Sequence, residues 1–482
     1  MRRLRTTQLR QLIAAVDARH YATSLFADAR TEVRDAATGD FAVTMPVSTW
    51  VEVDLDRLAR NLAAIRAHVA PGESGESGVS AESARHAGSV GPAGSDGSKR
   101  HAREILLVVK ADAYGHGAVE IAEAAERAGV VHFGVATLHE GIQLREAGCR
   151  RPIVVLSPLL PSEIGEAIAH DLDPTICDDD FGNAFSAAAE LAGRALRFHV
   201  EVDTGMGRTG VREERAEEFI AGLVALPGLR LASVFTHFPD ADGSDLEFSH
   251  AQVVRFRSVL DRIEARGVPV PRVHAANSAG TLNVREALFD GVRVGLLAYG
   301  HSPTNAQVSL PIAPVMAFKS RLVQVRDLPA GTPVSYGRTF VTERASRIGV
   351  VAAGYGHGLS WLLSNRGHML VGGARVPIAG RVTMDLTMVD ITGVPDARVG
   401  DEVVLFGHQG GATIALEEVA AWSETLPYEI MCTIGKRVAR IYLSDGRPVK
   451  LTSLVGERAE WTRQAIDHFR LRELAVAAAR RG

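Results

Sequence analysis

The sequence lacks several features that would assign it to a class of protein at once. It has only three cysteines in 482 residues, and their irregular spacing and odd count predict neither a cysteine metal site nor a disulfide framework. No stretch approaches the roughly 20 uninterrupted apolar residues of a membrane span. The formal net charge of −4 gives no basic field for nucleic acid or a membrane surface. We therefore expect a cytoplasmic protein without a metal, whose partners are small molecules or other protein chains.

Lysine is also scarce, because the chain contains only five. One of them, Lys110, closes the apolar run 105–109 and precedes Ala-Asp-Ala-Tyr114-Gly-His-Gly. This pattern predicts a buried strand with an amine at its carboxyl end, where α/β enzymes keep their chemistry. Lys110 is thus a candidate Schiff-base nucleophile, although a lysine at a strand end more often extends into solvent. The other four lie outside the motifs described below: Lys99, Lys319, Lys436 and Lys450.

Composition divides the chain into segments. Residues 1–47 are rich in Arg and Ala and predict a helical or partly disordered extension. Residues 71–103 are rich in Gly, Ser and Ala with almost no large apolar side chain, which predicts a flexible insertion. Residues 454–482 predict a polar helical tail.

Between these segments, short apolar runs alternate with helical patterns. An alternating strand at 49–54 and a helix from Leu55 open the fold, and seven further runs follow at 105–109, 132–136, 153–157, 197–202, 231–236, 273–276 and 291–295. Such alternation predicts a parallel sheet, and the number of strands favours a closed (β/α)₈ barrel over 48–305 rather than an open doubly wound sheet. Residues 306–453 carry strand-length runs broken by Gly and Pro, which predicts a second, mainly β domain.

Polar residues follow the predicted barrel strands where those strands end. They are Arg208 in Asp-Thr-Gly-Met-Gly-Arg, His237 in Thr-His-Phe, Asn277 and Ser278, Arg293 and Gly295. These positions belong to the catalytic face of a barrel, and the last loops usually hold a phosphate. Each motif is weak evidence alone, since an Asn-Ser pair after a strand is more often a helix cap.

In this order the motifs resemble the alanine racemase family, whose members bind pyridoxal phosphate and consist of a (β/α)₈ barrel followed by a β domain. The resemblance extends from about Trp50 to Lys450. Besides the motifs above, it is carried by Val-Ser-Tyr336-Gly, Thr-Met384-Asp385 and Pro-Tyr428-Glu. It implies interconversion of L- and D-alanine, which supplies D-alanine for peptidoglycan, by a homodimer with composite active sites.

The resemblance also implies roles for individual residues. Lys110 would bind the cofactor and act as base on one face of the substrate carbon, and Tyr336 of the partner subunit would serve the other face. Racemisation needs both, because a proton removed from one side must be replaced from the other. His237 would contact that tyrosine, and Arg293 would contact both His237 and the pyridine nitrogen. The remaining implied cofactor contacts are Tyr114, Arg208, Asn277, Ser278, Gly295, Leu296 and Tyr428, and the implied substrate contacts are Arg208, Tyr355, Met384 and Asp385.

Three places depart from the family pattern, and one of them is the loop Gly435-Lys436-Arg437, where we expect a difference at the subunit contact. Glu201 stands where many members carry a carbamylated lysine, and we expect it to orient Arg208 directly or through a water. His357 replaces an acid in Gly-Tyr355-Gly-His-Gly, which leaves the substrate range open. A racemase of serine or several small amino acids is therefore the main alternative, ahead of a pyridoxal-phosphate decarboxylase or a non-catalytic binding protein.

Overall fold

A computed structural model of the chain describes residues 47–70, 102–457, 462–467 and 469. The predicted N-terminal extension lies outside these ranges except for its last residue, and so does nearly all of the predicted 71–103 insertion. Most of the predicted 454–482 tail also lies outside them, and residues 462–467 of this tail are helical. Val47–Thr462 belongs to one compact unit. Its two large sheets share one continuous cluster of buried apolar side chains.

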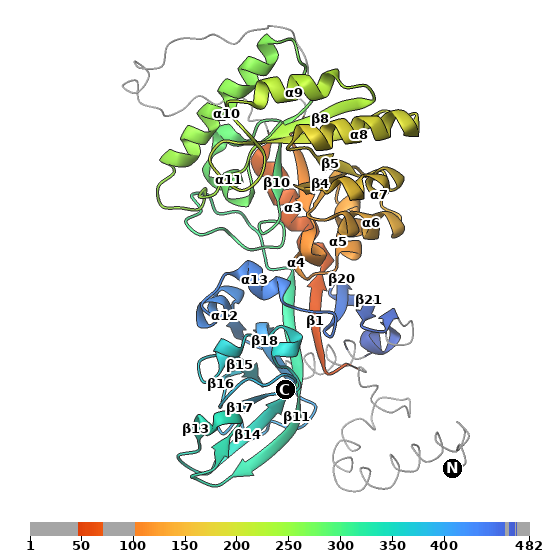
Figure 1. Cartoon of the computed structure of the whole chain (residues 1–482). Coiled ribbons are helices and arrows are strands. Elements are labelled where there is room, and N and C mark those ends of the chain that lie inside the picture. The colour runs from red at the N-terminus through yellow and green to blue at the C-terminus, as the bar shows by residue number, and fades with distance from the viewer. Residues whose placement is uncertain (1–46, 71–101, 458–461, 468, 470–482) are drawn as a thin grey trace, which may run out of the picture. The chain divides into compact units, whose positions relative to one another are not determined.

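The first large sheet closes into a barrel of eight parallel strands (Figure 1). The strands are β2 (Glu104–Val108), β3 (His132–Val135), β4 (Ile153–Pro158), β5 (Asp173–Thr175), β6 (Leu196–Asp203), β8 (Leu229–Phe235), β9 (Val273–His274) and β10 (Gly291–Val294). A ninth strand, β7 (Val211–Arg212), pairs only with β6. Closure depends on the pairing of Thr175 with His199 and of β10 with β2. The predicted (β/α)₈ architecture is confirmed.

The strand β5 was not predicted from the sequence. It consists of only Asp-Pro-Thr, and aspartate and proline are both depleted in strands because proline lacks the N–H that a sheet uses. The structure accommodates it because Thr175 donates its hydroxyl to the Val155 carbonyl at 2.7 Å. A hydrogen bond from a side chain to the backbone of the neighbouring strand, rather than strand propensity, thus helps to hold β5 in the barrel.

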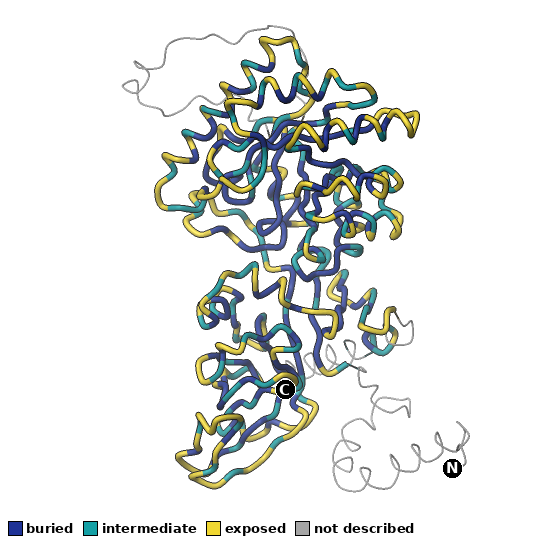
Figure 2. The backbone as a smooth tube through the Cα atoms, viewed as in Figure 1, coloured by how far each residue is buried: buried dark blue, intermediate teal, exposed yellow. Residues whose placement is uncertain are grey.

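Helices surround the barrel, with buried residues concentrated on its strands and exposed residues on the outer helix faces (Figure 2). The helices between barrel strands are α4 (Lys110–Tyr114), α5 (Ala118–Arg127), α6 (Leu138–Glu146), α7 (Ile164–Ala169), α8 (Asp179–Ala192), α9 (Ala216–Ala225), α10 (Glu247–Ala265) and α11 (Ser278–Asn283). Another helix, α3 (Leu55–Val69), begins after Asp54, whose carboxylate accepts the Arg57 N–H at 2.8 Å. Asn61 of α3 donates to the Ala298 carbonyl at 3.0 Å, which ties α3 to the loop after β10.

The second large sheet confirms the predicted β domain. Its strands are β1 (Thr49–Asp54), β11 (Met316–Leu328), β14 (Ser346–Val351), β15 (His368–Val371), β16 (Ala374–Pro377), β17 (Thr387–Asp390), β18 (Glu402–Gln409), β19 (Ala412–Ile414), β20 (Ala439–Ser444), β21 (Arg447–Ser453) and β22 (Gly456–Glu457). A separate hairpin contains β12 (Pro333–Val334) and β13 (Phe340–Val341), and two helices, α12 (Leu416–Trp422) and α13 (Pro427–Cys432), complete this part.

The strand β1 corrects the predicted domain limits. We placed it in the 48–305 barrel domain, but it lies in the second sheet, antiparallel to β11 and parallel to β20. Trp50, Val51 and Val53 are all buried, as expected for a strand with neighbours on both sides and cover on both faces. An apolar pattern of this kind reveals a buried strand but not the sheet to which it belongs.

None of the helices in the described parts of the chain combines the length and the apolar character needed to cross a bilayer. Within the same residues, His, Cys, Asp and Glu side chains form no group of three or more that could hold a metal ion.

Candidate active site

Lys110 stands at the carboxyl end of the barrel, where α4 begins. All four residues of Ala111–Tyr114 have φ between 52° and 56°, so this turn is left-handed. Such a backbone costs about 1–2 kcal/mol per residue for L-amino acids and must be held by its surroundings. One contact that holds it is the Glu140 carboxylate, which accepts the Ala111 N–H at 2.7 Å. The turn therefore fixes the Lys110 amine relative to the Tyr114 hydroxyl.

The environment of Lys110 shifts its amine toward the uncharged form. Burial lowers the pKa of Lys110, and the positive charge of Arg208 lowers this pKa further. An uncharged amine is the nucleophilic form of lysine. The site therefore suits covalent attachment of an aldehyde.

We expect the Arg208→Gln substitution to raise the pKa of Lys110, because it removes a neighbouring positive charge while burial remains. In cofactor-free protein, the midpoint of reductive methylation of Lys110 should move to higher pH, as followed by peptide mass spectrometry. Arg212→Gln is the matched control, since Arg212 pairs with Glu214 and is not among the groups that shift Lys110. An unchanged midpoint in Arg208→Gln would contradict this electrostatic account.

Donor groups suited to a phosphate gather beside this turn. Ser278 Oγ accepts the N–H groups of Gly295 and Leu297, each at 3.3 Å. A Cβ atom on Gly295 would lie 2.5 Å from the Tyr114 hydroxyl, so only glycine leaves this space open. The ring centroids of Tyr114 and Tyr428 are 6.2 Å apart. The structure thus brings together predicted phosphate contacts from different elements: Tyr114, Ser278, Gly295 with its neighbour Leu296, and Tyr428.

The two tyrosines of this group stay protonated at neutral pH. Burial raises the pKa of Tyr428 to about 12 and that of Tyr114 higher still. A protonated hydroxyl can donate a hydrogen bond to an anion. The hydroxyls and backbone N–H groups can therefore hold a phosphate without a lysine.

Arg293, on β10, is the buried cation of the site, with 4% of its surface exposed. It donates to the Thr236 carbonyl at 2.7 Å, to His274 Nδ1 at 2.9 Å and to His237 Nδ1 at 3.0 Å. Burial lowers its pKa to about 10, so it remains charged at neutral pH. Its guanidinium also lies 4.9 Å from the centre of the Phe235 ring.

His237 is neutral and carries its proton on Nε2. Burial lowers the pKa of His237 well below its usual value, and the charge of Arg293 lowers it further. Its Nδ1 accepts a hydrogen bond from Arg293, because arginine can only donate. The remaining nitrogen, Nε2, must then bear the hydrogen and can donate to another group.

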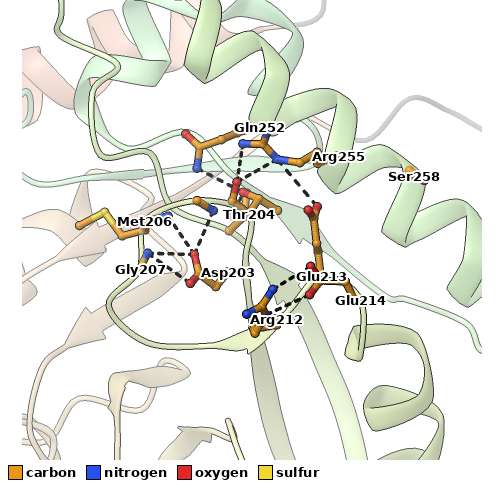
Figure 3. Close-up of polar contacts among 12 residues, drawn as sticks. Asp203, Thr204, Met206, Gly207, Arg212, Glu213, Glu214, Gln252, Arg255 and Ser258 are labelled. Atoms are coloured by element: carbon orange, nitrogen blue, oxygen red, sulfur yellow. Dashed lines mark hydrogen bonds and ion pairs between the residues drawn. The ribbon is translucent and has the colours of Figure 1, made fainter.

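The loop after β6 is shaped by Asp203, as Figure 3 shows. The Asp203 carboxylate accepts backbone N–H groups from Gly205 at 3.0 Å, Met206 at 2.8 Å and Gly207 at 3.1 Å. Arg208 follows these residues directly. Asp203 was not among the predicted site residues, although an aspartate before a glycine-rich turn signals this kind of capping.

We expect Asp203→Ala to lower kcat/KM for the reaction of this site at least about ten-fold, because a displacement of about 1 Å in a positioning group is enough for such a loss. The loss of three acceptor contacts should also reduce the free energy of unfolding by about 1–3 kcal/mol. Asp203→Asn keeps one acceptor oxygen and should recover most of both quantities. Equal activity of the alanine variant and the wild type would disprove a role for this loop.

Glu201 does not contact Arg208 directly in the described structure. Its carboxylate instead accepts the hydroxyl of Thr209, the next residue, at 2.6 Å. The predicted orienting role through a water remains a prediction.

Asn277 acts as the cap of α11. Its side-chain oxygen accepts the Gly280 N–H at 2.9 Å, and its amide donates to the Phe238 carbonyl at 3.2 Å. These contacts place Ser278 at the start of the helix. A contact between Asn277 and a cofactor remains a prediction.

The other predicted site residues form a second, exposed group on the β domain. Tyr336 is 75% exposed, and Met384 is 52% exposed. Tyr336 follows Ser335, whose φ of 66° is rare for a residue other than glycine, and the Ser335 hydroxyl donates to the Arg381 carbonyl at 2.7 Å. The Tyr355 N–H donates to the Thr383 carbonyl at 2.9 Å, which brings Tyr355 beside the loop of Met384.

Asp385 in this second group is paired with Arg437 at 2.7 Å. His357, the departure from the family pattern, is buried, and this burial, followed by the charge of Arg437, lowers the pKa of His357. Within the described residues, no hydrogen bond or ion pair joins this group to the barrel group, so the chain presents two parts of a site.

Comparison with known proteins identifies the family. The N-terminal domain pattern of alanine racemases matches residues 97–303, and the C-terminal domain pattern matches residues 315–442. The alanine racemase of Desulfosudis oleivorans is 40% identical over 407 residues, which cover 82% of this chain and 96% of that protein. The chain belongs to the alanine racemase family.

Solved alanine racemases agree with this assignment in fold. The enzyme of Clostridium difficile 630 is 30% identical, with a TM-score of 0.75, and the match covers 85% of this chain and 99% of that one. The alanine racemase of Bartonella henselae, solved with covalently bound pyridoxal phosphate, is 26% identical with a TM-score of 0.69, covering 83% and 100%. Membership of the alanine racemase family confirms the prediction of an amino-acid racemase.

Proposed function

We propose that the protein interconverts L- and D-alanine with pyridoxal 5'-phosphate held by Lys110. The observation that carries the proposal is the convergence, at one end of the barrel, of an amine with a lowered pKa, a group of hydroxyl and N–H donors and a buried arginine. Pyridoxal phosphate, when bound, withdraws electrons from the substrate carbon so that its proton can be removed. The donor set fits this cofactor: Lys110 for the aldehyde, Tyr114, Ser278 and Tyr428 for the phosphate, and Arg293 for the ring nitrogen.

Arg293 would determine how strongly the cofactor ring withdraws electrons. Because arginine does not release its proton readily, it leaves the ring nitrogen largely unprotonated. Arg208 extends from the adjoining loop, where its planar donors suit the substrate carboxylate. The Met384 backbone of the partner subunit would add a second carboxylate contact. These residues bind and orient the substrate, and two further groups move the proton.

Lys110 would exchange the proton on one face of the substrate carbon and Tyr336 of the partner subunit on the other. A homodimer is supported by the exposure of Tyr336 and Met384, because a protein surface that presents such side chains together is typical of an interface. The Nε2–H of His237 would donate to the Tyr336 oxygen and favour its deprotonated form. D-Alanine made in this way would supply peptidoglycan synthesis.

We also propose that the protein works in the cytoplasm. All three cysteines, Cys149, Cys177 and Cys432, are free thiols, and free thiols persist in a reducing compartment.

The test is to incubate purified protein with L-alanine and, separately, with L-serine, and to measure the D-form by chiral chromatography. We expect fast conversion of alanine and slower conversion of serine, since one added hydroxyl is rejected only modestly by a small pocket. Borohydride should fix the cofactor to the Lys110 peptide. Lys450→Ala is the control lysine variant, because Lys450 pairs with Glu120 away from the site. Absence of a reduced adduct on Lys110 would overturn the proposal.

A further inference from the structure

A line of polar side chains runs through the barrel interior behind Arg293. Arg293 donates to His274 Nδ1 at 2.9 Å, His274 Nε2 lies 3.0 Å from Ser233 Oγ, and Ser233 Oγ lies 2.6 Å from His199 Nδ1. The last three residues come from β9, β8 and β6 and are 8%, 1% and 6% exposed. Buried polar groups are costly unless they are hydrogen-bonded, and these side chains satisfy one another in a single series of contacts.

The donors and acceptors allow only one direction along the line. Arginine can only donate, so His274 Nδ1 accepts. Burial lowers the pKa of His274 well below its usual value, so this ring is neutral and its hydrogen sits on Nε2, which donates to Ser233. The hydroxyl hydrogen of Ser233 then has one remaining acceptor among the described residues, His199 Nδ1. Each hydrogen bond in this line is therefore donated in the direction away from Arg293.

The far end of the line lies beside a carboxylate, although His199 Nε2 makes no hydrogen bond within the described residues. His199 Nε2 lies 3.9 Å from Asp173 Oδ2, beyond hydrogen-bond range but close enough for attraction between a ring N–H and a carboxylate. Asp173 is held in turn by Arg197, whose Nε lies 3.1 and 3.0 Å from its two oxygens. The line thus begins at a group that only donates and ends beside one that only accepts.

We propose that Ser233 and His199 are positioning residues for racemisation, acting through His274 on Arg293. They hold His274 in the tautomer that accepts from one arm of the guanidinium, which leaves the other arm for His237. If His274 carried its hydrogen on Nδ1 instead, two donors would face each other and Arg293 would turn away from both histidines. This inference rests on the proposed function, in which Arg293 faces the cofactor ring and His237 faces the tyrosine of the partner subunit.

The first measurement reads the tautomers directly. In holoenzyme labelled with ¹⁵N-histidine, long-range proton–nitrogen spectra should show His274, His199 and His237 with the hydrogen on Nε2. Ser233→Ala should convert part of the His274 population to the Nδ1–H form. Ser249→Ala is the matched control, because Ser249 is equally buried and its hydroxyl has no hydrogen-bond partner among the described residues.

The second measurement reads the reaction. We expect Ser233→Ala to lower kcat about ten-fold, as the loss of one transition-state hydrogen bond does, with KM changed less than about two-fold. Ser233→Thr, which keeps the hydroxyl, should restore kcat, and His199→Phe should repeat the loss if Ser233→Ala fails to fold. The absorption spectrum of the bound cofactor should shift in the two low-activity variants and stay unchanged in Ser249→Ala.

The outcomes separate this inference from the proposed function. If wild type racemises alanine and Lys110→Ala does not, but Ser233→Ala matches Ser249→Ala in tautomers, kcat and spectrum, the line is only structural and the inference fails. If Lys110→Ala remains active, the proposed function fails, whereas the tautomer measurement still tests the direction of the line.

Discussion

Mixing two inactive variants, Lys110→Ala and Tyr336→Phe, is expected to restore racemase activity that neither has alone. Each lesion removes the base on one face, and a proton-transfer group contributes about 10²–10⁴-fold to a rate. If Tyr336 serves the site of the partner subunit, a mixed dimer has one site with both lesions and one site with none. After subunit exchange at equal concentrations, about a quarter of wild-type activity should return, since half of the dimers are mixed and each keeps one of its two sites.

The control is a mixture of wild type with the double variant Lys110→Ala/Tyr336→Phe, which carries both substitutions on one chain. Its mixed dimers have one lesion in each site, so activity should fall below that of wild type mixed with buffer. Recovery that appears without subunit exchange, or no recovery after exchange shown by native mass spectrometry, would contradict composite sites.

Arg293→Leu is expected to have the second largest effect. It leaves the nitrogen acceptors of His237 and His274 and several carbonyls without their donor, which should lower the free energy of unfolding by about 3 kcal/mol. Racemisation should fall about 10²–10³-fold, as it does when a preorganised donor is removed from an active site. Chiral chromatography and denaturant unfolding measure the two effects.

Two variants separate charge from geometry at this position. Arg293→Lys keeps the charge but not the planar fork that bonds both histidines, so it should recover stability more than activity. Arg266→Leu removes an exposed arginine paired with Glu217 and should change stability by less than about 1 kcal/mol. Full activity in Arg293→Leu would remove the arginine from the mechanism.

The sequence predicted the barrel well because parallel strands are covered on both faces and therefore read as apolar runs. Seven barrel strands carried that signal. The eighth, Asp173–Thr175, did not, because its place depends on pairing with strands distant in sequence. The sheet that contains Thr49–Asp54 was missed for the same reason.

The position of a site residue could be predicted where it depends only on which strand the residue belongs to or follows in the sequence. The motifs placed Lys110 and His237 after strand ends, where the structure has them, whereas Arg293 lies within β10. Contacts between side chains were harder to predict, because they depend on rotamers and on neighbours from other strands. The acceptor that Glu201 offers to Thr209 and the loop held by Asp203 are examples.

The position of β1 has a consequence for how the protein is synthesised. Residues of β1 leave the ribosome before the barrel, whereas their partners in β11 and β20 emerge after it. Until then both edges of β1 lack a neighbouring strand, and apolar side chains such as Trp50 are not covered. Such a strand can pair wrongly with other nascent chains. A gene fragment meant to yield the β domain alone must therefore carry the codons for residues 49–54, from the opposite end of the reading frame.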